Sequence, residues 1–151
     1  MGPPETTTEI PVGPETVWAV LQDGWLYPLW VVGATHMRDV DDDWPAVGSR
    51  LHHSVGPWPL QLGDSTEVLD VDPGRMLSLH ARAWPFGTAR VVITLEPTAR
   101  GCRVRLAEEA DRGLGWLVPT VVQAPLIETR NTEALRRLTD IATGRADGGG
   151  C

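Results

Sequence analysis

The chain has 151 residues, of which 42% are hydrophobic and 22% charged, a size and composition typical of one globular domain. No apolar run approaches the roughly 20 residues that cross a bilayer, so we expect no stable membrane insertion. The net charge of −7 disfavours nucleic acid as a partner, because phosphate binding needs a surplus of cations.

All 13 basic residues are arginines, so no lysine can form a Schiff base with a substrate. The first residues lack the basic start and apolar segment of a secretion signal, which predicts a cytoplasmic protein. Cys102 and Cys151 do not make a disulfide framework, and we expect both to be free thiols in a reducing compartment.

The predicted elements begin with a strand from Thr6 to Ile10, followed by a break and a helix start at Pro11 to Pro14. Glu15 to Gln22 carries one apolar stripe at helical spacing, which predicts a helix that ends at Gly24. The aromatic segment from Trp25 to Trp30 predicts a short second helix or a turn.

The middle of the chain shows period-2 segments separated by turn residues, which is typical of an antiparallel meander. The expected strands are Gly33 to Val40, Ser49 to Val55, Leu60 to Val71, Met76 to Trp84, Thr88 to Glu96 and Cys102 to Glu109. Gly63-Asp64 predicts a bulge or bend in the third of these strands. Asp72-Pro73-Gly74 predicts a tight turn, because proline presets φ and glycine accepts a positive φ.

A long amphipathic helix is expected last, with Pro119 in its first turn and Pro125 as a kink or restart. Its apolar stripe consists of Ile127, Ala134, Leu135, Leu138, Ile141 and Ala142. Asn131 lies on the same stripe. Residues 144–151, which end in three glycines and Cys151, are expected to form a disordered tail.

These elements predict an α+β fold in which a curved, six- to seven-stranded antiparallel sheet wraps around the long C-terminal helix. Two short helices follow the first strand. The terminal helix is the only long amphipathic element that can cover one face of the sheet. A strongly bent sheet that grips one helix leaves space between them, and a ligand would bind in that space.

Four local patterns then resemble a known family. They are Ile10-x-x-x-Pro14-x-x-Val17-Trp18-x-x-Leu21, Tyr27-Pro28-Leu29-Trp30, Val47-Gly48-Ser49-Arg50-Leu51 and Val68-x-x-x-Asp72-Pro73-Gly74-Arg75-Met76-Leu77. In this order they resemble the SRPBCC superfamily, also called START-like or Bet v 1-like, and its bacterial polyketide cyclase/dehydrase-like group. The resemblance implies one helix-grip domain over residues 5–143, a lipid-like or polycyclic ligand and no obligatory metal. It supplies no universal catalytic motif.

Strand alternation predicts which side chains face the helix. The inward residues of the last three strands are Leu77, Leu79, Ala81, Ala83, Ala89, Val91, Ile93, Leu95, Cys102, Val104, Leu106 and Glu108. The small side chains Ala81, Ala83 and Ala89 leave volume on this face. Either a ligand fills that volume, or a tryptophan or leucine from the helices does.

Polar residues on these apolar faces are candidates for chemistry. Glu108 either orients a polar ligand group or acts as a general base, or it is a rim residue in water near Arg112. His53 shares a face with Leu51 and either donates a hydrogen bond to a ligand carbonyl or is a satisfied core group. Its neighbour His52 points the opposite way, so the pair cannot chelate a metal from one strand.

Two further polar side chains belong to the expected helices. The amide of Asn131 needs hydrogen-bond partners, which either a ligand or the sheet backbone supplies. Tyr27 and Trp30 lie near the expected mouth of the cavity, where Tyr27 either hydrogen-bonds a ligand or belongs to the core.

We therefore expect a non-catalytic protein that binds or transports a hydrophobic small molecule, with no cofactor and no metal. The predicted ligand-binding residues are Tyr27, Trp30, Leu51, His53, Leu79, Ala81, Ala83, Ala89, Val91, Ile93, Leu106, Glu108, Asn131 and Leu135. One alternative is a polyketide cyclase or dehydratase in which Glu108 or His53 moves protons. The other is a protein-interaction module that docks a partner on the sheet surface or helix groove.

Overall fold

The computed structural model describes residues 5–31, 34–55, 62–83, 87–112 and 120–148, and the side chains of 5–31, 39–52, 65–81, 88–109 and 128–145. The strands are β1 (Glu5–Ile10), β2 (Ala34–Val40), β3 (Arg50–Val55), β4 (Leu62–Asp72), β5 (Met76–Ala83), β6 (Gly87–Pro97) and β7 (Cys102–Arg112). The helices are α1 (Pro14–Leu21), the 3-10 turn η1 (Gly24–Leu26), α2 (Tyr27–Trp30) and α4 (Thr120–Gly148).

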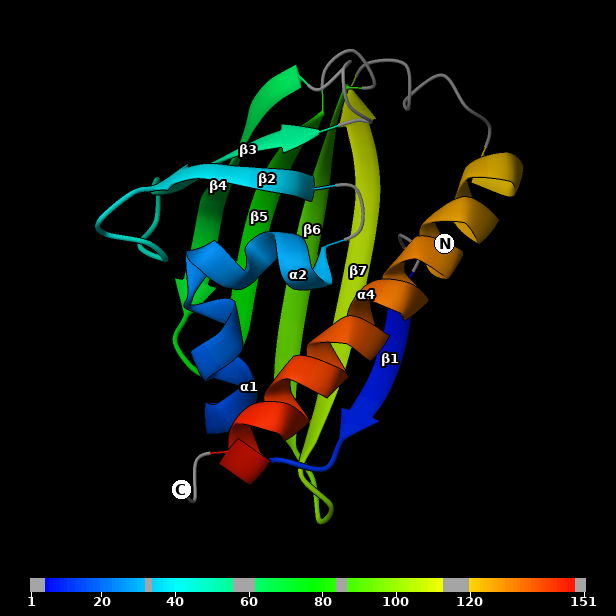
Figure 1. The fold of residues 1–151 in the computed structure, drawn as a ribbon. Helices are drawn as coiled ribbons and strands as arrows, with labels where there is room; N and C mark the ends of the chain where they lie inside the picture. The colour runs from blue at the N-terminus through cyan, green and yellow to red at the C-terminus, as the bar shows by residue number, and fades with distance from the viewer. Residues whose placement is uncertain (1–4, 32–33, 56–61, 84–86, 113–119, 149–151) are drawn as a thin grey trace.

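The described strands form one seven-stranded sheet in the order β1-β7-β6-β5-β4-β3-β2, and every neighbouring pair is antiparallel. Figure 1 shows the sheet curving around α4, with α1 and α2 on the same side of the sheet as α4. The predicted α+β helix-grip architecture is confirmed.

The first helix begins as its sequence predicts. Pro14 occupies the first helical position, where its missing N–H had no partner, and Glu15 adds negative charge to the positive helix end. The apolar stripe of α1 is buried and consists of Val17, Trp18, Val20 and Leu21. The chain then turns through η1, whose first turn is capped by the Asp23 carboxylate accepting from the Trp25 backbone N–H at 3.2 Å.

The turn after β4 forms at the predicted place. The Arg75 N–H donates to the Asp72 carbonyl at 2.9 Å, and Gly74 adopts a φ of 82°, which an L side chain rarely does. This turn starts β5 in the register that pairs Leu77 with Val71.

The bulge of β4 lies at a different place from the prediction. Pairing with β3 runs regularly through Gly63 and Asp64, so the predicted bulge at these residues is wrong. The register instead shifts between Val68 and Asp70 in the pairing with β5. Val68 is therefore buried while both Leu69 and Asp70 are exposed, which keeps the aspartate off the concave face.

The last helix is longer than predicted. It continues through Pro125 without a restart, and it runs to Gly148 where a tail was expected from Gly144. The guanidinium of Arg145 lies 3.5 Å from the Asp23 carboxylate, which ties this end of the helix to the segment before η1. No described helix combines the length and apolarity that a membrane span requires.

One side of α4 packs toward the β1–β7 edge of the sheet and against α1 and α2. The buried residues on this side are Asn131, Ala134, Leu135, Leu138 and Ala142, which confirms the predicted stripe over these positions. Ile141 is half-buried, and the side chain of Ile127 lies outside the described residues.

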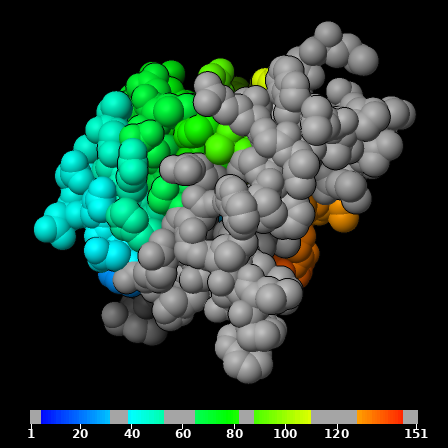
Figure 2. All heavy atoms as spheres, turned by 90° about the horizontal axis from the view of Figure 1, so that it is seen from above, coloured from blue at the N-terminus to red at the C-terminus, as the bar shows by residue number. Residues whose placement is uncertain are grey.

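The position of α4 toward one edge is visible from above. Residues 39–52 and 65–81, in cyan and green, lie on the side of the molecule opposite to the orange atoms of α4 (Figure 2). The helix therefore covers the edge of the concave face near β1 and β7 rather than β3 and β4.

Candidate functional site

Strand register places a small apolar patch on the concave face, near the end of β5 and the start of β6. Ala81 of β5 pairs with Ala89 of β6, and Leu79 pairs with Val91. Leu79 is 1% exposed, whereas Ala81, Ala89 and Val91 are only half-buried, although they share its face of the sheet. We call Ala81, Ala89 and Val91 the concave patch.

The same face is closed toward the other end of these strands. Leu77 and Ile93 pair across β5 and β6 and are each 1% exposed, and Leu95 is also buried. Here α1 packs against β6. The concave face is thus tightly packed at one end and accessible at the patch.

A polar pair adjoins the patch on the β4 side. Thr66 pairs with Ala81 and is fully buried, and its hydroxyl lies 3.2 Å from that of Tyr27, where either group can donate. Burial raises the pKa of Tyr27, while the Thr66 hydrogen bond and the charge of Arg130 lower it. Tyr27 also packs edge-to-face on Trp30, with ring centroids 5.5 Å apart.

A second polar pair adjoins the patch on the β7 side. Glu108 pairs with Val91, is 8% exposed, and forms an ion pair with Arg130 of α4. The alternative of a solvated rim residue near Arg112 is therefore wrong. Although 44% of the Arg130 side chain is exposed, burial of the remainder lowers its pKa, opposed by the nearby Tyr27.

The residue after Arg130 brings an amide into the interior. Asn131 is 3% exposed, and its Nδ2 has no hydrogen-bond partner among the described residues. A sheet-backbone partner, one of the two expected alternatives, is not found for this nitrogen within the described part of the chain.

The remaining predicted residues fall into two groups. Those buried in the core are Trp30, Leu51, Leu79, Ile93, Leu106 and Leu135. His53 and Ala83 hold strand positions in β3 and β5, and their side chains lie outside the described residues.

Two residues of the site, Thr66 and Arg130, were not predicted from the sequence. Thr66 alternates with the inward Val68 along β4, so the period-2 pattern could have found it. Arg130 carried no such signal, because its contact with Glu108 depends on how α4 sits on the sheet.

The other ionisable residues near β3 and β7 form no such site. His52 Nε2 lies 3.0 Å from the Asp41 carboxylate, and this hydrogen bond lowers the pKa of Asp41. Cys102 is a buried free thiol whose pKa is raised by burial. Within the described ranges no group of three or more His, Cys, Asp or Glu side chains could hold a metal ion.

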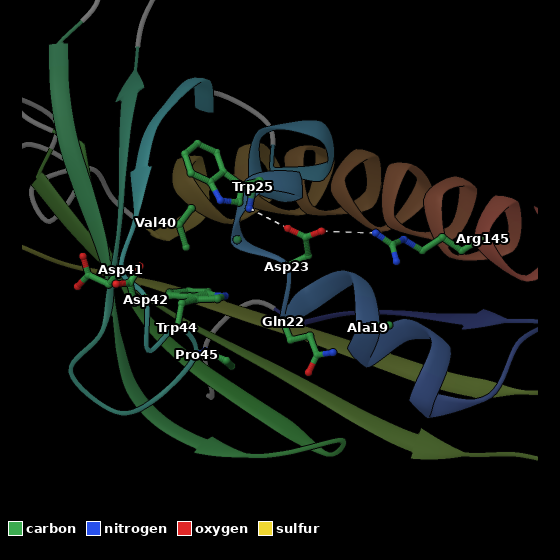
Figure 3. Close-up of a pocket in the computed structure, with 11 residues that line it drawn as sticks. Ala19, Gln22, Asp23, Trp25, Val40, Asp41, Asp42, Trp44, Pro45 and Arg145 are labelled. Carbon is green, nitrogen blue, oxygen red and sulfur yellow. Dashed lines mark hydrogen bonds and ion pairs between the residues drawn. The ribbon is translucent and has the colours of Figure 1, made fainter. Parts of the chain in front are cut away.

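A hollow of about 560 Å³ opens at another place on the surface, beside α1 and η1 (Figure 3). Its lining residues are Ala19, Gln22, Asp23, Gly24, Trp25, Val40, Asp41, Asp42, Trp44, Pro45 and Arg145. Two of the lining residues, Asp23 and Arg145, form an ion pair, so the hollow lies where the C-terminal part of α4 contacts the segment between α1 and η1.

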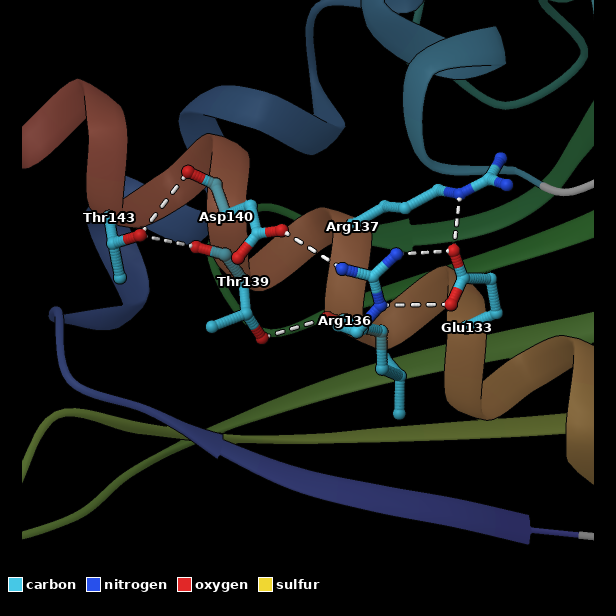
Figure 4. Close-up of polar contacts among 7 residues, drawn as sticks. Glu133, Arg136, Arg137, Thr139, Asp140 and Thr143 are labelled. Atoms are coloured by element: carbon cyan, nitrogen blue, oxygen red, sulfur yellow. Dashed lines mark hydrogen bonds and ion pairs between the residues drawn. The ribbon is translucent and has the colours of Figure 1, made fainter.

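The outer face of α4 carries a local charge network (Figure 4). The Glu133 carboxylate accepts from the guanidinium of Arg136 at 2.7 and 2.9 Å and from that of Arg137 at 3.0 Å. These hydrogen bonds lower the pKa of Glu133 to about 2. The network stabilises the solvent-facing side of the helix whose other side bears Asn131.

The comparisons with known proteins agree with this geometry. The family described as polyketide cyclase / dehydrase and lipid transport matches residues 4–143. The chain belongs to this family. The match confirms the SRPBCC resemblance stated from the sequence, and no curated protein matches the chain.

Solved structures similar to this polyketide cyclase / dehydrase and lipid transport family member share its fold. A Rhodobacter sphaeroides protein is 22% identical, with 93% of this chain and 91% of that chain covered and a TM-score of 0.69. The di-domain ARO/CYC StfQ of the steffimycin biosynthetic pathway is 13% identical, with 95% and 51% covered and a TM-score of 0.68. Ara h 8.0201 is 11% identical, with 93% and 96% covered and a TM-score of 0.67.

The Glu133 network predicts an acid-dependent stability difference. The folded pKa of about 2 lies below the ordinary 4.5, so the network stabilises the protein above pH 4.5 and this contribution disappears as the pH falls toward 2. Glu133→Gln should lower the urea midpoint at neutral pH and leave it unchanged at the acid end. An equal difference at every pH would contradict this assignment.

The Glu108–Arg130 pair predicts a non-additive double mutant. Arg130→Met should destabilise the protein by about 2 kcal/mol, because the buried Glu108 carboxylate loses its cation. Glu108→Gln combined with Arg130→Met should recover most of that loss, since no charge is left unpaired. Urea unfolding of the wild type, the two single variants Glu108→Gln and Arg130→Met, and the double variant measures the coupling free energy. Strictly additive losses of stability would show that the two side chains do not interact.

Proposed function

We propose that this protein binds a hydrophobic small molecule on the concave patch, between the sheet and α4, and carries it without transforming it. The observation that carries the proposal is the partial exposure of Ala81, Ala89 and Val91 on the concave face. Small side chains there leave contacts unmade, which an apolar guest would supply. Each Å² of apolar surface that it buries contributes about 25 cal/mol.

The polar groups beside the patch suit orientation of a ligand. Tyr27 is held by Thr66 on the β4 side, and Glu108 is held by Arg130 on the β7 side. A few fixed polar groups around an apolar surface are typical of small-molecule sites. The family description, which includes lipid transport, supports the same class of ligand.

The ion pair also supports binding over catalysis. A general base works best when its carboxylate is desolvated without a compensating charge, and a neighbouring cation weakens its affinity for a proton. Glu108 has such a cation in Arg130. The carboxylate is therefore suited to fixing α4 and a ligand group rather than to accepting a substrate proton.

A cyclase or dehydratase remains the second candidate, because Glu108 adjoins the patch and the similar protein StfQ is an ARO/CYC. Glu108→Gln separates the two functions, since glutamine keeps the shape but accepts no proton. A carrier should keep its affinity for an apolar probe within about twofold. This change in binding free energy is well below the roughly 1.4 kcal/mol that a tenfold change represents. Loss of turnover of a polyketide-like substrate in this variant would favour the enzyme.

Filling the patch should abolish binding without harming the fold. Ala89→Leu places three more carbons over the patch, so binding of the neutral fluorescent probe N-phenyl-1-naphthylamine should be largely lost. The free energy of unfolding should stay within about 1 kcal/mol of the wild type, because added carbons enter open space, whereas overpacking typically costs 1–3 kcal/mol.

The matched control is Val92→Leu, which enlarges a half-buried side chain of β6 that points to the opposite face of the sheet from Ala89. This variant should bind the probe as the wild type does. Wild-type protein that does not bind the probe, or an Ala89→Leu variant that binds it equally well, would contradict the proposed function.

A further inference from the structure

The interior face of α4 carries one amide in an otherwise apolar stripe. Asn131 is 3% exposed, and its buried neighbours on the stripe include Ala134, Leu135 and Leu138. Its Nδ2 has no hydrogen-bond partner among the described residues. A buried donor without an acceptor is costly, and leucine at this position would avoid that cost. The amide therefore needs an acceptor from outside the described chain.

The ion pair next to Asn131 places this amide beside the concave patch. Arg130 reaches Glu108, and Glu108 lies directly opposite Val91 of the patch. The one-residue step from Arg130 to Asn131 turns the side chain from the half-exposed edge of α4 to its buried face. A ligand on the patch would thus have the Asn131 amide within its surroundings.

A second unpaired polar group lies at the same junction. The Thr6 hydroxyl of β1 is buried and has no hydrogen-bond partner among the described residues. Thr6 pairs with Leu106, which lies two residues before Glu108 on the same face of β7. The junction of β1, β7 and α4 therefore holds two neutral groups without a hydrogen-bond partner among the described residues, an amide and a hydroxyl. The Glu108 Oε2 atom also lacks a hydrogen bond there, but it faces the Arg130 guanidinium as an ion pair.

The charges at this junction cancel. Arg130 is engaged by Glu108, so a ligand carboxylate would be buried without a free cation, and a ligand ammonium without a free anion. A carbonyl or other neutral oxygen would accept from Asn131 at no such cost. We infer that Asn131 receives a neutral oxygen acceptor of the ligand and makes the site select a ketone over a carboxylate of equal size, which rests on the proposed function.

Three probes with the same ring system test this inference, measured at neutral pH by displacement of N-phenyl-1-naphthylamine. They are 2-acetylnaphthalene and 2-naphthoate, whose substituents are of equal size, and the unsubstituted naphthalene. Asn131→Leu should weaken the ketone about fivefold and leave naphthalene unchanged or tighter. That factor corresponds to ~1 kcal/mol, the net worth of one hydrogen bond, at 1.4 kcal/mol per tenfold. Of the three probes, 2-naphthoate should have the lowest affinity for the wild-type protein.

Two controls separate recognition from folding. Thr132→Val changes the exposed residue that follows Asn131, and this variant should bind each of the three probes as the wild type does. The ligand-free Asn131→Leu protein should melt no lower than the wild type, since an unpaired amide is removed. If Asn131→Leu fails to fold, Asn131→Ala replaces it. This variant should show the ratio of ketone affinity to naphthalene affinity that is expected for Asn131→Leu.

The outcomes distinguish this inference from the proposed function. If naphthalene binds and the ketone loses no affinity in either Asn131 variant, Asn131 does not select the ligand, while the carrier function stands. If the naphthoate binds tightest and Arg130→Met abolishes that preference, Arg130 is the selecting group and the inference is overturned. If the wild type binds none of the probes, the proposed function fails and the inference fails with it.

Discussion

The packing of one helix against the edge of a curved sheet determines the rest of this structure. Leu135 and Leu138 are almost fully buried where α4 packs, and each contributes about 1.5–3 kcal/mol of apolar burial. A straight helix that packs toward β1 and β7 cannot also follow the concave surface to its centre. The small side chains on β5 and β6 are therefore left half-covered, and this is the surface on which we propose that an apolar guest binds.

The polar groups of the interior gain their arrangement from the same packing. Arg130 meets Glu108 because α4 packs against β7, and Tyr27 at the start of α2 meets Thr66 of β4. The Tyr27 and Thr66 hydroxyls are neutral, and the Glu108 charge is paired with that of Arg130, so neither pair leaves a free charge beside the concave patch. Asn131 differs, because its nitrogen is buried without a described partner. These neutral and paired groups are the basis of our proposal that the site holds and orients a neutral molecule.

Local patterns predicted what depends on local geometry. Alternation placed Leu79 and Glu108 on the concave face, because side chains of a strand point to opposite faces with a period of two. The partner of Glu108 could not be predicted, since Arg130 reaches it only through the docking of α4 on the sheet. The β4 bulge at Leu69 likewise could not be predicted, because the pairing with β5 decides it. The helix continues beyond Gly144, where Arg145 lies next to Asp23, a contact distant in sequence.

Xenon binding followed by methyl NMR tests the central claim most directly, because xenon enters apolar space and needs no particular ligand chemistry. We expect the methyl resonances of Ala81, Ala89 and Val91 to shift saturably with xenon pressure, while that of the exposed Ala99 does not shift. Resonances of the three patch residues that stay unmoved would show that the space above them is filled by the protein itself.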